Sequence, residues 1–278
     1  MKRHIFIALF LSFTFVLVAC SVKDKNYELN NTKDIVPKIN GQATQNSSLE
    51  SDNKNSESNY KNDLSDMAYK ISKASYIDKD IIINYPQLIH LNDTKKYTEV
   101  NELIKNEALE VLGEYKGVEN EFSLEIDYNV KWKSSNLLSI QYLGISYIRG
   151  AAHPNNLVYT ININLNSSDI LKLRDIIKIN DSFVERYKKG KYITWDPDLN
   201  LEAEGVIKNI LDNYTNRDLI QYFSKDESFY YFTKDSLGIS IGAAHVYGDH
   251  AEFEIKYQDM IYNINDKSEI WKDFSDYL

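Results

Sequence analysis

The sequence predicts an α+β fold of two small lobes, each an antiparallel sheet with helices packed on one face. Two observations predict this class. In the first half of the folded region, strands with strict alternation of apolar and polar residues follow a helical pattern, and the second half contains both patterns in a different order. Alternation is typical of strands with one face on the core and the other in water, which favours antiparallel pairing with helices on one side.

The first lobe is predicted to span residues 67–167. A strand is expected at "YIDKDIII", residues 76–83, and Pro86 is expected to end its regular pairing. Apolar residues three or four apart within residues 97–111 predict a helix that stops at Gly113. Alternating patterns predict three more strands, at residues 122–130, 136–149 and 157–165.

The second lobe is predicted to span residues 168–264. Its boundary is placed at the turn-forming residues 166–170, and residues 265–278 are interpreted as a C-terminal tail. Helical spacing predicts four helices, at residues 171–177, 183–189, 201–213 and 216–223. Strand patterns occur at residues 228–234, 237–242 and 251–257.

The N-terminal segment has the features of a bacterial lipoprotein signal. Lys2 and Arg3 precede an apolar run that ends directly before Cys20, the only cysteine of the chain. Residues 1–19 are therefore predicted to be a signal peptide, with Cys20 lipidated and the chain anchored on the outer face of the bacterial cell membrane. An uncleaved N-terminal anchor is the alternative. Residues 20–66 are polar and without apolar period, which predicts a disordered tether.

The net charge restricts the kind of partner. Without residues 1–19 the chain has 30 basic and 41 acidic residues, a formal net charge of −11. This charge disfavours nucleic acid as a partner and favours a cationic one, although solubility alone also accounts for it. No cofactor is expected.

Two short stretches begin with the same four letters, "GAAHPNN" at residues 150–156 and "GAAHVYGDH" at residues 242–250. They contain three of the five histidines, His153, His245 and His250. Neither stretch has the spacing of a zinc motif, so no metal is expected. Connecting loops are the first interpretation and a binding loop is the second; the roles of His245 and His250 stay open, and the shared letters are interpreted as coincidental.

The stretch "SYIRGAAHPNN", residues 146–156, resembles the S-Y-x-x-G-G-A-H-P-N signature of a bacterial exported family. That family joins two modules, found in the N-terminal, non-catalytic part of a peptidoglycan deacetylase (PdaC) and in the extracytoplasmic part of a lysozyme-responsive anti-sigma factor (RsiV-like). Residues 83–88 resemble the opening of the first module and residues 232–260 the closing of the second. The resemblance implies a PdaC-like lobe followed by an RsiV-like lobe.

The function that the resemblance implies is recognition without catalysis. The expected partner is lysozyme or another cationic protein, or peptidoglycan in the cell envelope, in addition to the membrane through lipid on Cys20. The expected binding residues lie around the signature stretch: Tyr147, Arg149, His153, Asn155 and Asn156.

The alternative function is a cell-wall hydrolase. Four carboxylates surround Trp195, and a pair of carboxylates is what glycoside cleavage uses. These residues are Asp196, Asp198, Glu202 and Glu204. The same composition is typical of a turn followed by the acidic first turn of a helix.

Overall fold

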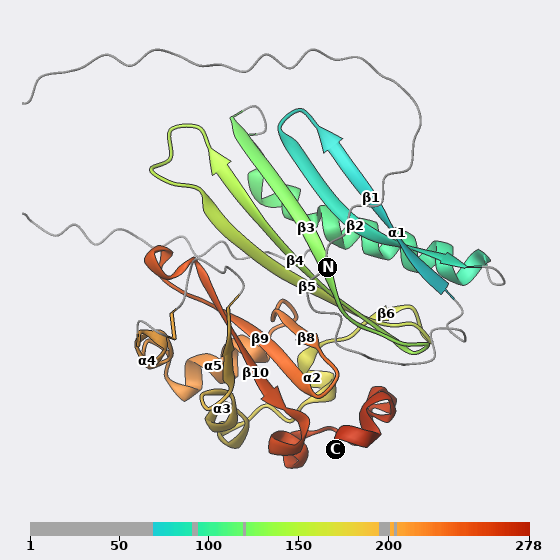
Figure 1. Cartoon of the computed structure of the whole chain (residues 1–278), viewed down its shortest axis with the longest axis vertical. Helices are drawn as coiled ribbons and strands as arrows, with labels where there is room; N and C mark the ends of the chain where they lie inside the picture. Colours follow the sequence, from blue (N-terminus) through green and yellow to red (C-terminus); the bar gives the residue numbers. More distant parts are fainter. Residues whose placement is uncertain (1–68, 91–93, 119–120, 195–200, 203–204) are drawn as a thin grey trace, which may run out of the picture. The chain divides into compact units, whose positions relative to one another are not determined.

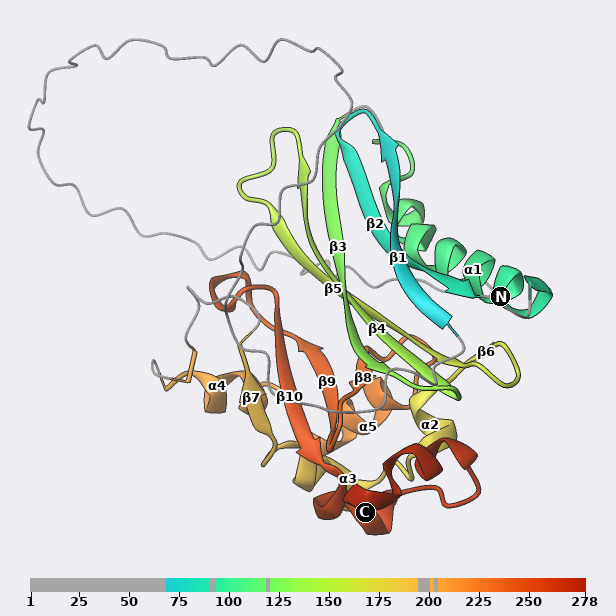
Figure 2. The ribbon, with the colours of Figure 1, turned by 45° about the vertical axis from the view of Figure 1, so that its right-hand side comes forward.

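The structure is a computed structural model that describes residues 69–90, 94–118, 121–194, 201–202 and 205–278. All of these residues fall in one compact unit of the chain. They form a mixed α+β fold with two open sheets, one of six strands and one of four, which confirms the predicted class (Figures 1 and 2). No helix in the described ranges has the length and apolar character needed to cross a bilayer.

The first sheet has the strand order β1-β2-β3-β4-β5-β6. The strands are β1 (Tyr69–Asp78), β2 (Ile81–His90), β3 (Phe122–Lys133), β4 (Leu137–Ile148), β5 (Asn155–Asn164) and β6 (Asp169–Ile170). Every pair is antiparallel except β2 with β3, which run parallel where residues 81–83 meet residues 124–126. The chain makes this parallel connection through helix α1 (Thr94–Leu109) and the 3-10 helix η1 (Glu110–Tyr115), as a parallel pair requires a crossover.

Helix α1 lies along one face of this sheet (Figures 1 and 2). Its buried stripe packs against strand residues that alternate along β2 to β5, and Tyr159 Oη donates a hydrogen bond of 2.9 Å to the carbonyl of Ala108. The stripe consists of Tyr97, Val100, Ile104 and Ala108, spaced by three or four residues. The prediction of a helix followed by three alternating strands in the first half is thus confirmed.

The prediction for residues 76–83 is wrong, because this stretch holds a turn. Strands β1 and β2 form a hairpin around Lys79, whose φ of 53° lies in the left-handed region. Pro86 does not end the pairing either, since it lies inside β2 opposite Lys73. A proline is tolerated there because β2 pairs with β3 only over residues 81–83, so the ladder on that side needs no N–H donor from Pro86.

The second sheet has the strand order β7-β10-β9-β8. Its strands are β7 (Lys191–Ile193), β8 (Tyr230–Phe232), β9 (Ser236–Gly242) and β10 (His250–Lys256). The helices of this half are α2 (Leu173–Ile176), α3 (Asp181–Tyr187), α4 (Ile207–Asp212) and α5 (Asn216–Phe223), with 3-10 helices η2 (His245–Tyr247), η3 (Tyr257–Asn263) and η4 (Glu269–Tyr277). Helix α5 starts with a capping box in which Thr215 and Asp218 satisfy each other's backbone N–H groups.

The last residues of the chain pack into the core of the second half. Ile270, Trp271 and Phe274 are buried, and Trp271 Nε1 donates to the carbonyl of Ile176 at 3.1 Å. The Phe274 ring stacks on Phe232 with centroids 5.3 Å apart. Residues 265–278 therefore contribute to the hydrophobic core, where the sequence suggested a tail.

Each sheet has its own hydrophobic cluster, and hydrogen bonds of polar side chains connect one sheet to the other. On the face of the first sheet opposite α1, Ser139 accepts from the Phe232 N–H at 3.0 Å and Asn162 donates to the Tyr230 carbonyl at 2.6 Å. Gln141 on the same face donates to Glu252 at 2.8 Å. One end of this face of the first sheet is therefore hydrogen-bonded to strands β8 and β10 of the second sheet.

Candidate functional site

The other end of that face carries a group of exposed side chains. Five residues on the neighbouring strands β1 to β5 lie directly opposite one another and form one row across the sheet. They are Ile77, Ile82, Glu125, Ile145 and Asn156. Asp127 and Tyr147 lie beside this row on the same face. The residues Ile77, Ile82, Glu125, Asp127, Ile145 and Tyr147 are called the open face below.

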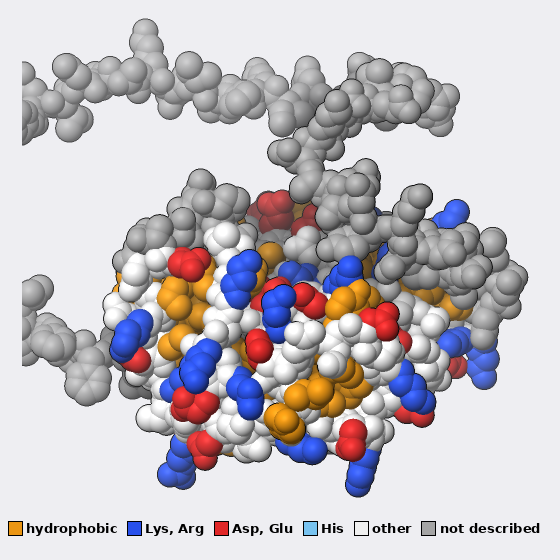
Figure 3. Space-filling model, turned by 60° about the horizontal axis from the view of Figure 1, so that its bottom comes forward, with side chains coloured by type: hydrophobic (Ala, Val, Ile, Leu, Met, Phe, Trp, Pro, Cys, Tyr) orange, Lys and Arg blue, Asp and Glu red, His pale blue; other side chains and the backbone are white. Residues whose placement is uncertain are grey.

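The open face is apolar for an exposed sheet surface. The exposed fractions are 69% for Ile77, 38% for Ile82, 51% for Ile145 and 39% for Tyr147. Exposed apolar side chains that gather in one place mark interaction sites more often than single ones do. Apolar side chains also reach the surface elsewhere, and the face drawn in Figure 3 shows them among side chains of both charge signs.

A hollow of about 390 Å³ lies in the open face. It is lined by Glu125, Asp127, Leu143, Gly144, Ile145, Asn156 and Leu157. The absence of a side chain at Gly144 is required by the fold, because a Cβ atom there would be 2.4 Å from the carbonyl oxygen of Glu125. The hollow is large enough for a few side chains of a partner or for a small ligand.

The two carboxylates of the hollow differ in their partners. Asp127 forms an ion pair of 2.9 Å with Lys73, and both side chains are at least half exposed. Glu125 is exposed as well, and no ion pair joins it to any of the described residues. Within the described part of the chain, the Glu125 carboxylate between Ile82 and Ile145 therefore has no counter-ion.

Next to the open face, the two stretches that begin with "GAAH" meet. The His153 ring stacks on the His245 ring with centroids 3.4 Å apart and planes 11° apart. Asp249 accepts from the Asn156 N–H at 2.8 Å and lies 3.0 Å from His245 Nδ1. We call His153, His245, Asp249 and Asn156 the histidine junction.

The backbone of the second loop places the Asp249 carboxylate. Gly248 has a φ of 90° and Asp249 a φ of 70°, and a non-glycine residue in the left-handed region is uncommon. Asn156 belongs to both features, since it lines the hollow and is held by Asp249. Nothing in the sequence predicted this contact, since Asn156 and Asp249 are 93 positions apart.

The five predicted binding residues lie at one end of the β4–β5 hairpin. Tyr147 is on the open face and its hydroxyl donates to the Ala151 carbonyl at 3.4 Å. Arg149 and His153 are exposed in the loop, whereas Asn155 and Asn156 are half-buried at the start of β5. The lipidation residue Cys20 and the hydrolase residues Trp195, Asp196, Asp198 and Glu204 lie outside the described residues. Glu202 is described and exposed.

A buried polar network that the sequence did not indicate links the two sheets. Glu252 accepts from Gln141 at 2.8 Å and from the Tyr231 hydroxyl at 3.2 Å. Burial raises the pKa of the Glu252 carboxyl despite these hydrogen bonds. Lys131 Nζ lies 4.1 Å from the centre of the Tyr231 ring.

His250 lies beside this network and is buried as well. Its Nδ1 is 3.8 Å from Glu252 Oε1, too far for a hydrogen bond, and burial lowers the pKa of the imidazole to about 4. The neutral imidazole is the form that the fold accommodates. The hydrogen bonds of Glu252 join β10 to β4 and β8, so we assign the network to the joining of these strands.

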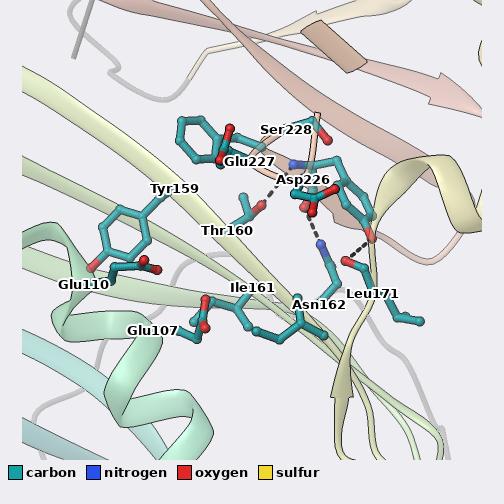
Figure 4. A pocket seen from close by; sticks show the side chains of 13 residues that line it. Glu107, Glu110, Tyr159, Thr160, Ile161, Asn162, Leu171, Asp226, Glu227 and Ser228 are labelled. Atoms are coloured by element: carbon teal, nitrogen blue, oxygen red, sulfur yellow. Dashed lines mark hydrogen bonds between the residues drawn. The ribbon is translucent and has the colours of Figure 1, made fainter. Parts of the chain in front are cut away.

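A second, smaller cavity of about 40 Å³ lies between β5, α1 and the segment before β8 (Figure 4). Its polar atoms are mostly used within the fold: Thr160 accepts from the Tyr230 N–H at 2.9 Å, and Tyr230 Oη donates to the Leu171 carbonyl at 2.8 Å. Asp226 forms an ion pair of 2.7 Å with Lys172. The cavity has room for a few water molecules and is too small for a sugar ring.

No group of three or more His, Cys, Asp or Glu side chains that could hold a metal ion occurs among the described residues. The histidine junction contributes two imidazoles and one carboxylate, with the rings nearly parallel. Ring nitrogens of parallel stacked imidazoles do not converge on one point, so this arrangement is not a preformed metal centre.

Comparisons with known proteins support one part of the resemblance. Residues 72–156 match the model of a family described as deacetylase PdaC. The matched segment is less than a third of the chain. Two crystal structures of the DUF3298 family are similar. The protein from Bacteroides fragilis NCTC 9343 is 15% identical, with 75% of this chain and 97% of that chain covered and a TM-score of 0.47. The protein from Pseudomonas aeruginosa PAO1 is 14% identical, with 71% and 93% covered and a TM-score of 0.44.

The search of curated proteins gave no match. The chain thus carries a PdaC-like N-terminal module, and the matched residues contain the open face and His153. The RsiV-like character of the second half stays a prediction.

Proposed function

We propose that this protein is a lipid-anchored extracytoplasmic binding protein without catalysis, held on the outer face of the bacterial membrane through Cys20. The observation that carries the binding role is the hollow of about 390 Å³ in the open face, where exposed apolar side chains surround Glu125. The PdaC-like module supports an association with the cell envelope.

The partner in this proposal is lysozyme or another strongly cationic protein, with peptidoglycan as the second candidate in the envelope. The formal charge of −11 predicted for the chain without residues 1–19 supports a cationic partner, because charge complementarity accelerates encounter and excludes like-charged proteins. Nothing in the geometry of the described residues favours the hydrolase alternative, for which Glu202 is the one described carboxylate.

The test is calorimetric titration of the chain from residue 21 onward, which retains every described residue, with a c-type lysozyme at low and moderate salt. Binding in the micromolar range or tighter that weakens with salt is expected, since screening reduces the attraction between exposed charges. Titration with soluble peptidoglycan fragments is run in parallel. If neither probe binds at either salt concentration, the proposed function is wrong.

A further inference from the structure

We infer that Glu125 is the anchor of the open face, and that it receives the guanidinium or ammonium group of a basic side chain flanked by apolar residues on a protein partner. This inference rests on the proposed function and names the chemistry of the partner at the same site.

The position of Glu125 in its row is the first argument. Its cross-strand neighbours on β2 and β4 are Ile82 and Ile145, and Ile77 extends the row on β1. Directly opposite side chains in a sheet have Cβ atoms about 4.5–5.5 Å apart, so the carboxylate rises between two branched aliphatic side chains. A partner that covers these isoleucines must also cover Glu125.

The second argument is the cost of covering an ionised carboxylate. A carboxylate that is removed from water requires a counter-charge and hydrogen-bond donors. Asp127 already has Lys73 at 2.9 Å, whereas no ion pair within the described residues supplies Glu125. The partner must therefore supply the donor, and arginine fits best because its planar group binds a carboxylate through two parallel hydrogen bonds.

The same charge argues against other occupants. A second copy docked face to face would have to bring a basic side chain to Glu125, and the one cation of the described residues that an ion pair places beside the open face, Lys73, is already paired with Asp127. A neutral glycan would leave Glu125 without a counter-charge and would meet three exposed isoleucines. The open face fits a basic protein surface in which a cation projects between apolar groups.

Matched substitutions test this inference on the chain from residue 21 onward. Glu125→Gln is compared with Glu99→Gln, which removes the same charge from the exposed surface of α1, on the other face of the sheet. Ile145→Asn is compared with Ile89→Asn, since these isoleucines are 51% and 54% exposed and Ile89 lies at the other end of β2. Circular dichroism checks that the four variants keep the fold.

With a c-type lysozyme as the probe, Glu125→Gln and Ile145→Asn are expected to weaken binding about tenfold each, and the two controls less than about twofold. Equal effects of Glu125→Gln and Glu99→Gln would mean that only net charge matters, and would overturn the inference while leaving the proposed function intact.

A second probe keeps the inference testable if lysozyme does not bind. The peptide acetyl-Ile-Arg-Ile-amide is titrated at millimolar concentration, with acetyl-Ile-Glu-Ile-amide as its control, and backbone amide shifts are followed by NMR. Shifts centred on Ile82, Glu125 and Ile145 with the arginine peptide alone support the inference. Shifts elsewhere, none at all, or the same shifts with both peptides overturn it.

Discussion

Acid should destabilise this protein through one buried imidazole, that of His250. The side chain is 3% exposed, and its pKa falls from 6.5 to about 4 in the folded state because burial disfavours the charged form. Between these two pH values the unfolded chain binds a proton that the folded chain does not, so stability decreases as the pH falls through this window. The full effect of a shift of this size is about 3 kcal/mol.

The neighbouring carboxyl contributes with the opposite sign. Because the pKa of Glu252 is raised in the folded state, the folded chain binds this proton at a higher pH than the unfolded chain does. The contribution of Glu252 to stability is therefore present at low pH and is lost as the pH rises towards neutral. The pH dependence of the unmodified protein is therefore a sum, and the His250 part must be isolated by substitution.

The perturbation is His250→Gln, which keeps a polar side chain without a titrating group. Urea unfolding is followed by tryptophan fluorescence at pH 7.5, 6.5, 5.5 and 4.5, and the difference in the free energy of unfolding between the unmodified protein and the variant is plotted against pH. Relative to the variant, the unmodified protein is expected to lose about 2.5 kcal/mol between pH 7.5 and 4.5, with equal urea m-values. A difference that does not change with pH would refute the reasoning that burial keeps His250 neutral.

Two further substitutions test the features around the hollow. Asp249→Ala removes the hydrogen-bond acceptor of Asn156 and His245 and should lower the free energy of unfolding by about 1–3 kcal/mol, measured with urea. Asp249→Gly should lower it by less, because glycine adopts the φ of 70° without strain. An equal loss in both variants would contradict backbone strain at this position. Gly144→Ala should lower the free energy of unfolding by more than about 1 kcal/mol, because the new Cβ would be 2.4 Å from the backbone oxygen of Glu125. An unchanged melting temperature of this variant would show that the strands adjust without cost.

Local periodicity was sufficient for the elements that alternate or repeat regularly. Strands β3, β4 and β5 and helix α1 were predicted because each presents one apolar face to the same core, so their patterns are visible in single segments. The hairpin of β1 and β2 was missed because apolar residues continue on both sides of Lys79 and no glycine marks the turn. Strand β7 has three residues, too few to show a period.

The parallel pairing of β2 with β3 could not be predicted either. It joins residues 81–83 to residues 124–126 across a helix, and alternation along each strand is the same for either direction of pairing. The polar side chains that join the sheets were hidden for a related reason. Gln141 and Glu252 are 111 positions apart, and each by itself is an ordinary exposed residue type.

The sequence by itself determined the α+β class, most of the elements and the resemblance around His153, and the lipid attachment at Cys20 stays a prediction. The tertiary structure decided which side chains share a surface. Strand register placed Glu125 between Ile82 and Ile145, and the meeting of two loops brought His153 onto His245. Pairs of this kind depend on contacts between residues far apart in the chain, whereas the patterns in a single sequence report only which face of each segment is apolar.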